Sequence, residues 1–205
     1  MFEIFLFINP IGIYCFDTEK LIRNTVDELG IDVCYHYVPI ANVCLVKDDM
    51  IRRRQDGQKS SDISSISTAT YEALRNYHAI KLSYGNKKAR RYLYELQKHL
   101  SKDASVYTPE LFQKIIDKLN IKASTINAIK QGDYLKASIE DDQKLANQWS
   151  VKSTPTLVLF DENDDQNGVL LDGPVSQQDL VTLLMPGCEK DFSDFLPLQN
   201  HLRLI

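Results

Sequence analysis

Cys15 is the residue of this sequence that is best placed to do chemistry. It follows an apolar run, residues 2–8, that ends in Asn9-Pro10, and it stands at the start of a segment with helical spacing. Such a run is typical of a strand buried on both faces of a sheet, so Cys15 would lie where a strand turns into a helix. Reacting groups of α/β proteins gather at these turns. One interpretation is a lone reactive thiol; the other, which we favour, is a small residue packed under the first helical turn.

Cys34 and His36 are a second pair with chemical potential. They lie two residues apart in segment 31–39, which is rich in β-branched and aromatic residues and ends at Pro39. On a strand this spacing places both side chains on one face, where they could form half of a zinc site. The sequence shows no second pair of ligands, and its four cysteines include no Cys-x-x-Cys spacing (Cys15, Cys34, Cys44 and Cys188). We therefore expect packed side chains, with no metal and no cofactor.

Three charged segments could bind partners. One is a basic cluster at the start of a predicted helix, made of Lys87, Lys88, Arg90 and Arg91. The helix dipole does not stabilise positive charge there, so a partner-binding role competes with that of a solvated face. The three arginines of 52–54 leave the same two interpretations open. The acidic run 161–165 has Gln166 and Asp172 where a calcium loop needs Gly and Glu, which favours a solvated hairpin tip.

Composition excludes several classes of protein. The chain has 205 residues, 43% of them hydrophobic, which suits one domain or one domain with a large insertion. A net charge of −4 gives no overall attraction for nucleic acid or anionic lipid. The apolar run 2–8 is too short to span a bilayer and lacks a basic leader. We therefore expect a cytoplasmic protein whose cysteines stay reduced.

The elements that must position these residues fall into three blocks. Strand, helix and strand are predicted at 2–8, 16–29 and 31–39, which make a βαβ unit. Segment 41–65 lacks clear periodicity, and its polar run 55–61 is expected to be a mobile connection. Five helices follow, at 66–84, 89–100, 110–119, 124–131 and 133–149. The histidines are expected on the surface (His78, His99 and His201).

The last block is a hairpin, 156–160 with 168–171, and a helix to residue 184 that begins with a capping box at Ser176 and Asp179. The apolar tail 188–205 could dock onto a partner or cover its own domain, and we favour the second. The order βαβ, helices, ββα is that of a thioredoxin-like α/β fold with an all-helical insertion. We expect the thioredoxin-like domain at 1–45 and 150–205 and the insertion at 46–149.

Three segments carry a resemblance to a known family. They are the motif Gly12-Ile13-Tyr14-Cys15, the segment 85–97 in the insertion, and Val151-Lys152-Ser153-Thr154-Pro155-Thr156 before the third strand. The sequence resembles the DsbA-type branch of the thioredoxin superfamily. Within it, the sequence is similar to the YjbH or SpxH family, whose members are adaptors for degradation of the Spx regulator by the ClpXP protease. The resemblance implies a cis bond between Thr154 and Pro155, and a backbone edge there to which an extended peptide could pair.

The chain departs from this superfamily at its redox motif. The superfamily has Cys-x-x-Cys, whose first thiol is the nucleophile, whereas this sequence has Gly12 there and matches only the second thiol with Cys15. Longer family members also carry a cysteine- and histidine-rich segment before the first strand. This chain begins at that strand, which puts in doubt any redox or zinc control that resides in such a segment. The leading hypothesis is a non-catalytic adaptor for a Spx-type client and ClpXP. The alternative is a monothiol oxidoreductase or isomerase that uses Cys15, and a small-molecule isomerase is a third possibility.

Overall fold

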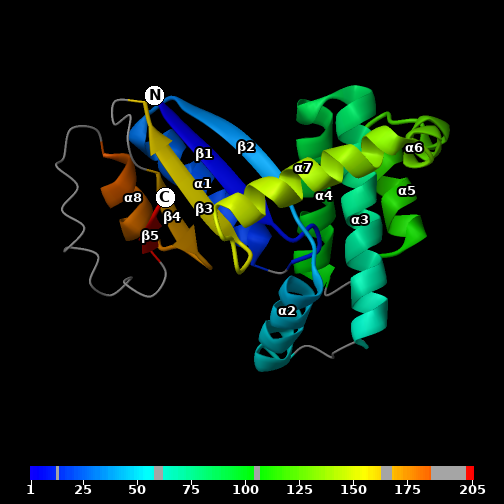
Figure 1. Cartoon of the computed structure of the whole chain (residues 1–205), viewed down its shortest axis with the longest axis horizontal. Helices are drawn as coiled ribbons and strands as arrows, with labels where there is room; N and C mark the ends of the chain where they lie inside the picture. Colours follow the sequence, from blue (N-terminus) through cyan, green and yellow to red (C-terminus); the bar gives the residue numbers. More distant parts are fainter. Residues whose placement is uncertain (13, 58–61, 104–106, 163–167, 186–201) are drawn as a thin grey trace.

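The computed structural model describes the whole chain except residues 13, 58–61, 104–106, 163–167 and 186–201 (Figure 1). Its centre is a five-stranded sheet in the order β2-β1-β3-β4-β5. The strands are β1 (Phe2–Ile8), β2 (Val33–Pro39), β3 (Thr156–Asp161), β4 (Val169–Asp172) and β5 (Leu202–Leu204). β1 and β2 run parallel, and the other neighbours are antiparallel. β2 is therefore an edge strand.

Both faces of β1 are buried, which explains its nearly continuous apolar sequence. Ile4, Leu6 and Ile8 belong to a core shared with α1 (Cys15–Leu29) and α8 (Gln177–Leu184). Phe7 faces the opposite way and packs with residues of β2, β3 and β4 and with Ala146 of α7 (Asp133–Gln148). The alternation of a strand thus sends successive side chains into two separate cores.

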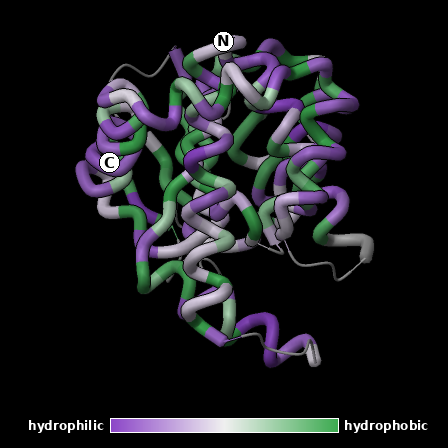
Figure 2. The backbone as a smooth tube through the Cα atoms, turned by 90° about the vertical axis from the view of Figure 1, so that its right-hand side faces the viewer, coloured by the Kyte–Doolittle hydropathy of each residue, from purple (hydrophilic) through white to green (hydrophobic). Residues whose placement is uncertain are grey.

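The remaining helices lie between β2 and β3 in the sequence. They are α2 (Val43–Gln55), α3 (Ile63–Tyr84), α4 (Asn86–Asp103), α5 (Pro109–Lys118) and α6 (Ala123–Lys130), followed by α7. α3 packs against α2, α4, α6 and α7 and is the centre of this group (Figure 1). Hydrophobic and hydrophilic residues alternate along these helices, as expected where each has one buried side (Figure 2).

The element order and a thioredoxin-like fold with inserted helices are confirmed, and the structure adds two elements that the sequence did not predict. The first is α2, which lies in segment 41–65, where the sequence shows no clear periodicity. Its N-terminus is capped by Asn42, whose side chain accepts a hydrogen bond from the Leu45 amide. Leu45, Val46 and Met50 are buried, so packing rather than a clear periodic pattern holds this helix.

The second is β5, in the C-terminal tail that we expected to cover its own domain. Most of it, Cys188 and His201 included, lies outside the described residues, but its last residues form β5 on the edge of β4. The Gly168 and Ile205 backbones exchange two hydrogen bonds, of 3.0 and 2.9 Å. The described end of the tail therefore pairs with its own sheet.

The sequence also predicted a capping box at the start of α8 and an acidic loop between β3 and β4. The capping box is confirmed, because Ser176 and Asp179 each accept from the other's backbone amide. Residues 163–165 of the acidic run 161–165 lie outside the described residues. In the described part of the chain, no helix has the length and apolar character needed to cross a bilayer.

Candidate functional site

A tight turn around Asn9 holds the motif that replaces Cys-x-x-Cys. The Asn9 side chain accepts a hydrogen bond from the Ile11 amide (3.1 Å), and the Asn9 backbone carbonyl accepts one from the Gly12 amide (3.0 Å). Gln97 of α4 also donates to that carbonyl, at 3.3 Å. A Cβ atom on Gly12 would lie 3.1 Å from the Cys15 sulfur, so the two positions face each other as a redox pair would. Ile13 lies outside the described residues.

Cys15 is the first residue of α1 and is almost fully buried, with 1% of its surface exposed. Burial raises the pKa of its thiol to about 12, and a backbone hydrogen bond at Asn9 offsets only part of this. The thiol is therefore protonated at neutral pH. Reactive cysteines need the opposite shift, because the thiolate is the nucleophile.

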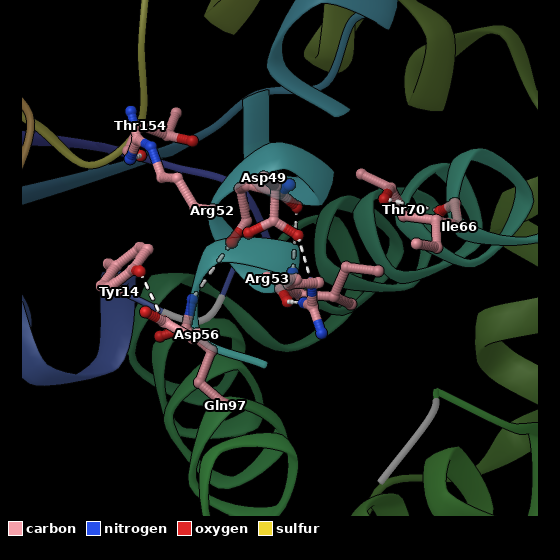
Figure 3. Close-up of polar contacts among 11 residues, drawn as sticks. Tyr14, Asp49, Arg52, Arg53, Asp56, Ile66, Thr70, Gln97 and Thr154 are labelled. Carbon is pink, nitrogen blue, oxygen red and sulfur yellow. Dashed lines mark hydrogen bonds and ion pairs between the residues drawn. The ribbon is translucent and has the colours of Figure 1, made fainter. Parts of the chain in front are cut away.

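The peptide bond between Thr154 and Pro155 is cis, as the sequence predicts. α2 contacts this turn, since Arg52 donates to the Thr154 carbonyl at 2.8 Å (Figure 3). The next residue, Arg53, donates to the Ile11 carbonyl at 2.5 Å and pairs with Asp49 at 2.6 Å. One carbonyl of the predicted peptide-binding edge is thus already bonded within the chain.

Tyr14 extends the contact between the motif and α2. Its hydroxyl donates to Asp56, just after α2, at 2.5 Å, and this hydrogen bond is the main reason that the pKa of Tyr14 is raised. The Arg52 guanidinium lies 5.7 Å from the centre of the Tyr14 ring. The end of α2 therefore covers both halves of the former redox site.

Sequence reasoning named the arginines of 52–54 but not their position at this site. A signal was present, because Asp48 and Asp49 precede Arg52 and Arg53 by four residues, the spacing of ion pairs on one helix. Arg54 is exposed. The contacts to Ile11 and Thr154 join parts of the chain too distant in sequence to be paired by pattern.

The basic cluster is split between two places. Lys88 donates to the Leu119 carbonyl at the end of α5. Lys87, Arg90 and Arg91 instead line a groove of about 980 Å³ along edge strand β2. We call this the β2 groove. Its walls come from β1, β2, α1, α3, α4 and α7.

The β2 groove combines aromatic rings with mostly positive charge. Arg90 lies over the rings of Tyr37 (4.7 Å) and Tyr35 (5.1 Å). Further basic residues line it from α1 and α3: Lys20, Arg23 and Lys81. Its acidic lining is Glu19, Glu95 and Asp142, and burial raises the pKa of Glu19 and of Asp142, the latter to about 6. Glu19 accepts a hydrogen bond from Tyr37 at 2.9 Å.

His78 is not on the surface, so that prediction is wrong. It is fully buried between α3 and α7, with Nδ1 2.8 Å from the Ser138 hydroxyl and Nε2 3.6 Å from Asp142. Burial, followed by the nearby Lys81, lowers the pKa of His78 to about 3, so the ring is neutral. His99 is half-buried, and its Nδ1 lies 2.8 Å from the Glu95 carbonyl.

Cys34 and His36 share a face of β2, as the sequence predicts. The Cys34 sulfur lies 3.5 Å from Nε2 of His36. Glu3 of β1 approaches the same nitrogen to 3.7 Å, which brings a third possible ligand that the sequence analysis did not associate with the pair. The sheet register explains it, because Glu3 is the direct neighbour of Cys34.

The βαβ–ββα order, the helices inserted between its halves and the cis-proline turn beside the start of α1 define a thioredoxin-like protein. A family model described as thioredoxin matches residues 5–181, and the chain belongs to this family.

Solved structures share this fold at low sequence identity. A putative protein disulfide isomerase from Nitrosomonas europaea superposes with a TM-score of 0.61 at 15% identity, covering 89% of this chain and 95% of that one. The thiol-disulfide exchange protein alpha-DsbA2 from Wolbachia pipientis gives 0.57 at 13% identity, with 87% and 77% covered.

Curated relatives include adapters. The ClpXP adapter protein SpxH of Staphylococcus epidermidis is 22% identical over 171 residues, 83% of this chain and 59% of the relative. SpxH of Staphylococcus saprophyticus is also 22% identical over 171 residues, 83% of this chain and 60% of the relative. This chain thus spans about three fifths of the length of these relatives.

Proposed function

We propose that this protein is a non-catalytic adaptor that binds a regulatory client and promotes its degradation by the ClpXP protease. The observation that carries the proposal is the state of the former redox site. Gly12 replaces the nucleophile, and Cys15 is buried with a pKa raised to about 12. The relatives named ClpXP adapter protein SpxH support the adaptor role with ClpXP. The family resemblance of the sequence implies a Spx-type client.

The β2 groove is the client-binding surface in this proposal. β2 is an edge strand, and its first four residues are only half-buried, so an extended segment of the client could pair with it. Lys87, Arg90 and Arg91 would then meet acidic side chains of that segment, and the Tyr35 and Tyr37 rings would add apolar contact. The proposal also requires that adaptor and protease share a compartment, for which the sequence predicts the cytoplasm.

The cis-proline turn has a secondary role in this proposal. The Thr154 carbonyl is bonded to Arg52, so a client could pair there only by displacing this side chain. We therefore place the first contact at the β2 groove and regard Thr154 and Pro155 as a turn that shapes the site.

The test is a degradation assay with purified ClpXP and a Spx-type client. The protein should shorten the client's half-life, and Lys87→Glu with Arg91→Glu should remove most of this effect because both side chains line the groove. Lys136→Glu is the matched control, since Lys136 is 80% exposed on α7 and does not line the groove. An unchanged client half-life in the presence of the native protein contradicts the adaptor role. If Lys136→Glu reduces the effect as much as the double variant does, only the assignment of the β2 groove as the client-binding surface is contradicted.

The alternative, a monothiol oxidoreductase or isomerase acting through Cys15, is less well supported by the buried thiol. Alkylation of the native protein, mapped by mass spectrometry, should label Cys34 and Cys44 long before Cys15, because Cys44 is exposed and Cys34 half-buried. Insulin reduction that disappears in Cys15→Ser would favour the enzyme instead.

A further inference from the structure

We propose that Glu3, Cys34 and His36 form a zinc-binding site on β1 and the edge strand β2. One ligand atom from each residue lies within 4.8 Å of the others. The proposal does not depend on the adaptor role, since it rests on a separate cluster of side chains.

The sheet itself brings the three ligands together. Glu3 is paired with Cys34 across the parallel β1 and β2 strands, and His36 lies two residues beyond Cys34 on the same face. All three positions are set by backbone hydrogen bonds of the sheet rather than by a loop. Sites built on strands hold their ligands in place better than sites on loops.

The observed spacing fits a tetrahedral ion. Zinc binds sulfur at about 2.3 Å and nitrogen or oxygen at about 2.0 to 2.2 Å, which places neighbouring ligand atoms roughly 3.3 to 3.6 Å apart. The Cys34 sulfur is 3.5 Å from the His36 Nε2, and that nitrogen is 3.7 Å from a Glu3 oxygen. An ion could therefore be bound with small side-chain movements.

The surroundings favour this geometry and leave access for the ion. The His36 ring stacks on Phe5, with the ring centres 4.2 Å apart and the planes 13° from parallel, which fixes the direction of Nε2. The side chains of Glu3 and His36 are 41% and 39% exposed. His36 also lines the β2 groove, so the ion would lie at its rim, with the fourth position open to water or to a partner.

The donor set selects the metal. A thiolate and an imidazole are soft or borderline ligands, which suit zinc and do not suit magnesium or calcium. Binding must displace the thiol proton of Cys34, so the apparent affinity should fall as the solution is acidified.

The test is a titration of the reduced full chain with Co²⁺, a coloured substitute for zinc. We expect one equivalent to bind, with a thiolate-to-cobalt charge-transfer band that zinc then removes. Cys34→Ser should abolish the band, and Glu3→Gln or His36→Gln should weaken binding at least tenfold. Cys44→Ser is the matched control, since Cys44 is an exposed free cysteine of α2 and its loss should leave the band unchanged.

Thermal unfolding with zinc gives a second readout. Zinc should raise the melting temperature of the native protein and of Cys44→Ser but not of Cys34→Ser, because an ion that binds only the folded state stabilises it. Failure to bind one equivalent, or a charge-transfer band that survives in Cys34→Ser, would show that Glu3, Cys34 and His36 make only direct contacts with one another and would overturn the proposal.

Discussion

Gly12 and Cys15 lie close enough together to form a pair, but only Cys15 carries a thiol. The turn at Asn9 still presents position 12 to the Cys15 sulfur, as measured by the 3.1 Å from a Cβ built on Gly12. Cys15 itself behaves as a small apolar residue, because burial keeps its thiol protonated up to strongly alkaline pH. What is missing is therefore the attacking group rather than the position for it.

This geometry predicts that Gly12→Cys can form a disulfide with Cys15. In a disulfide, each Cβ lies about 3 Å from the partner's sulfur, which agrees with the 3.1 Å available. The Cβ would also lie 3.0 Å from that of Asn9, so a shift of a few tenths of an ångström is needed. Mild oxidation should lower the intact mass by two hydrogens. In a digest, it should link the peptide that carries position 12 to the one that carries Cys15. Gly12→Ser, of similar size, should show neither change. A Gly12→Cys protein that keeps all five of its thiols free after oxidation would contradict the prediction.

At the scale of single residues, the sequence predicts the positions of those residues that belong to short local motifs. The position of Gly12, the place of Cys15 and the cis bond before Pro155 all follow from short motifs. The Arg52 contact could not be predicted, because Arg52 and Thr154 are 102 residues apart. His78 was misplaced for a similar reason: a helix pattern does not tell which helix will cover a given side chain.

α2 is the element that closes the former redox site. Its sequence gives weak helical periodicity because the apolar Val43 and Ile51 are exposed while the charged Asp49 is buried. Its stability depends on contacts with other elements. The Arg52 bond to Thr154 and the Arg53 bond to Ile11 fasten it to the two chain segments that meet at the site. Other helices, such as α5 with Thr108 as its cap and Pro109 in its first turn, have local signals and were predicted correctly.

Arg52→Ala should lower the free energy of unfolding by about 2 kcal/mol. A hydrogen bond from a charged donor contributes about 1.5 to 3 kcal/mol, and Arg52 is only 23% exposed. Arg54→Ala, in the same helix but exposed, should have an effect below about 0.5 kcal/mol. Urea unfolding of the two variants beside the native protein measures both values, and equal losses would show that Arg52 does not fasten α2.

The contact between α3 and α7 makes a second prediction, on pH. Folding lowers the pKa of His78 to about 3, so on acidification below about pH 6.5 the unfolded state takes up a proton and stability falls. Folding raises the pKa of Asp142 to about 6, so between about pH 6 and 4 the folded state takes up a proton and stability rises. The two contributions oppose each other in the native protein.

Asp142→Asn removes the contribution of Asp142 to this pH dependence and leaves that of His78. Between pH 6 and 4 the variant should lose about 1.4 kcal/mol more per pH unit than the native protein, because only the His78 contribution remains. Urea unfolding at several pH values gives the two slopes. Replacing His78 by Asn in the same variant should restore a flatter profile, and parallel profiles for Asp142→Asn and the native protein would contradict these pKa shifts.

At the scale of the molecule, the sequence predicts the order βαβ, helices, ββα, and thus the thioredoxin-like class. It does not predict that the last residues form β5. A three-residue strand carries too little pattern to be recognised, and it is defined by pairing with β4. The pairing covers one edge of the sheet, while β2 at the other edge lines the groove proposed for the client. The two edges are thus treated differently, which suits a protein that must pair with one partner and avoid others.

Removing residues 202–205 should therefore make the protein self-associate. β4 would become an edge strand with the apolar residues Val169, Leu170 and Leu171, and an uncovered edge of this kind pairs with other chains. Sedimentation velocity should show larger species for the truncated chain than for the full chain at the same concentration. Arg203→Ala is the control: it removes the bonds to Asp172 (2.7 Å) and to the Ser150 carbonyl (2.9 Å) but keeps the strand. The Arg203→Ala substitution should cost about 2 kcal/mol of stability without causing association. An identical size distribution for the truncated and full chains would show that β5 is not what protects this edge.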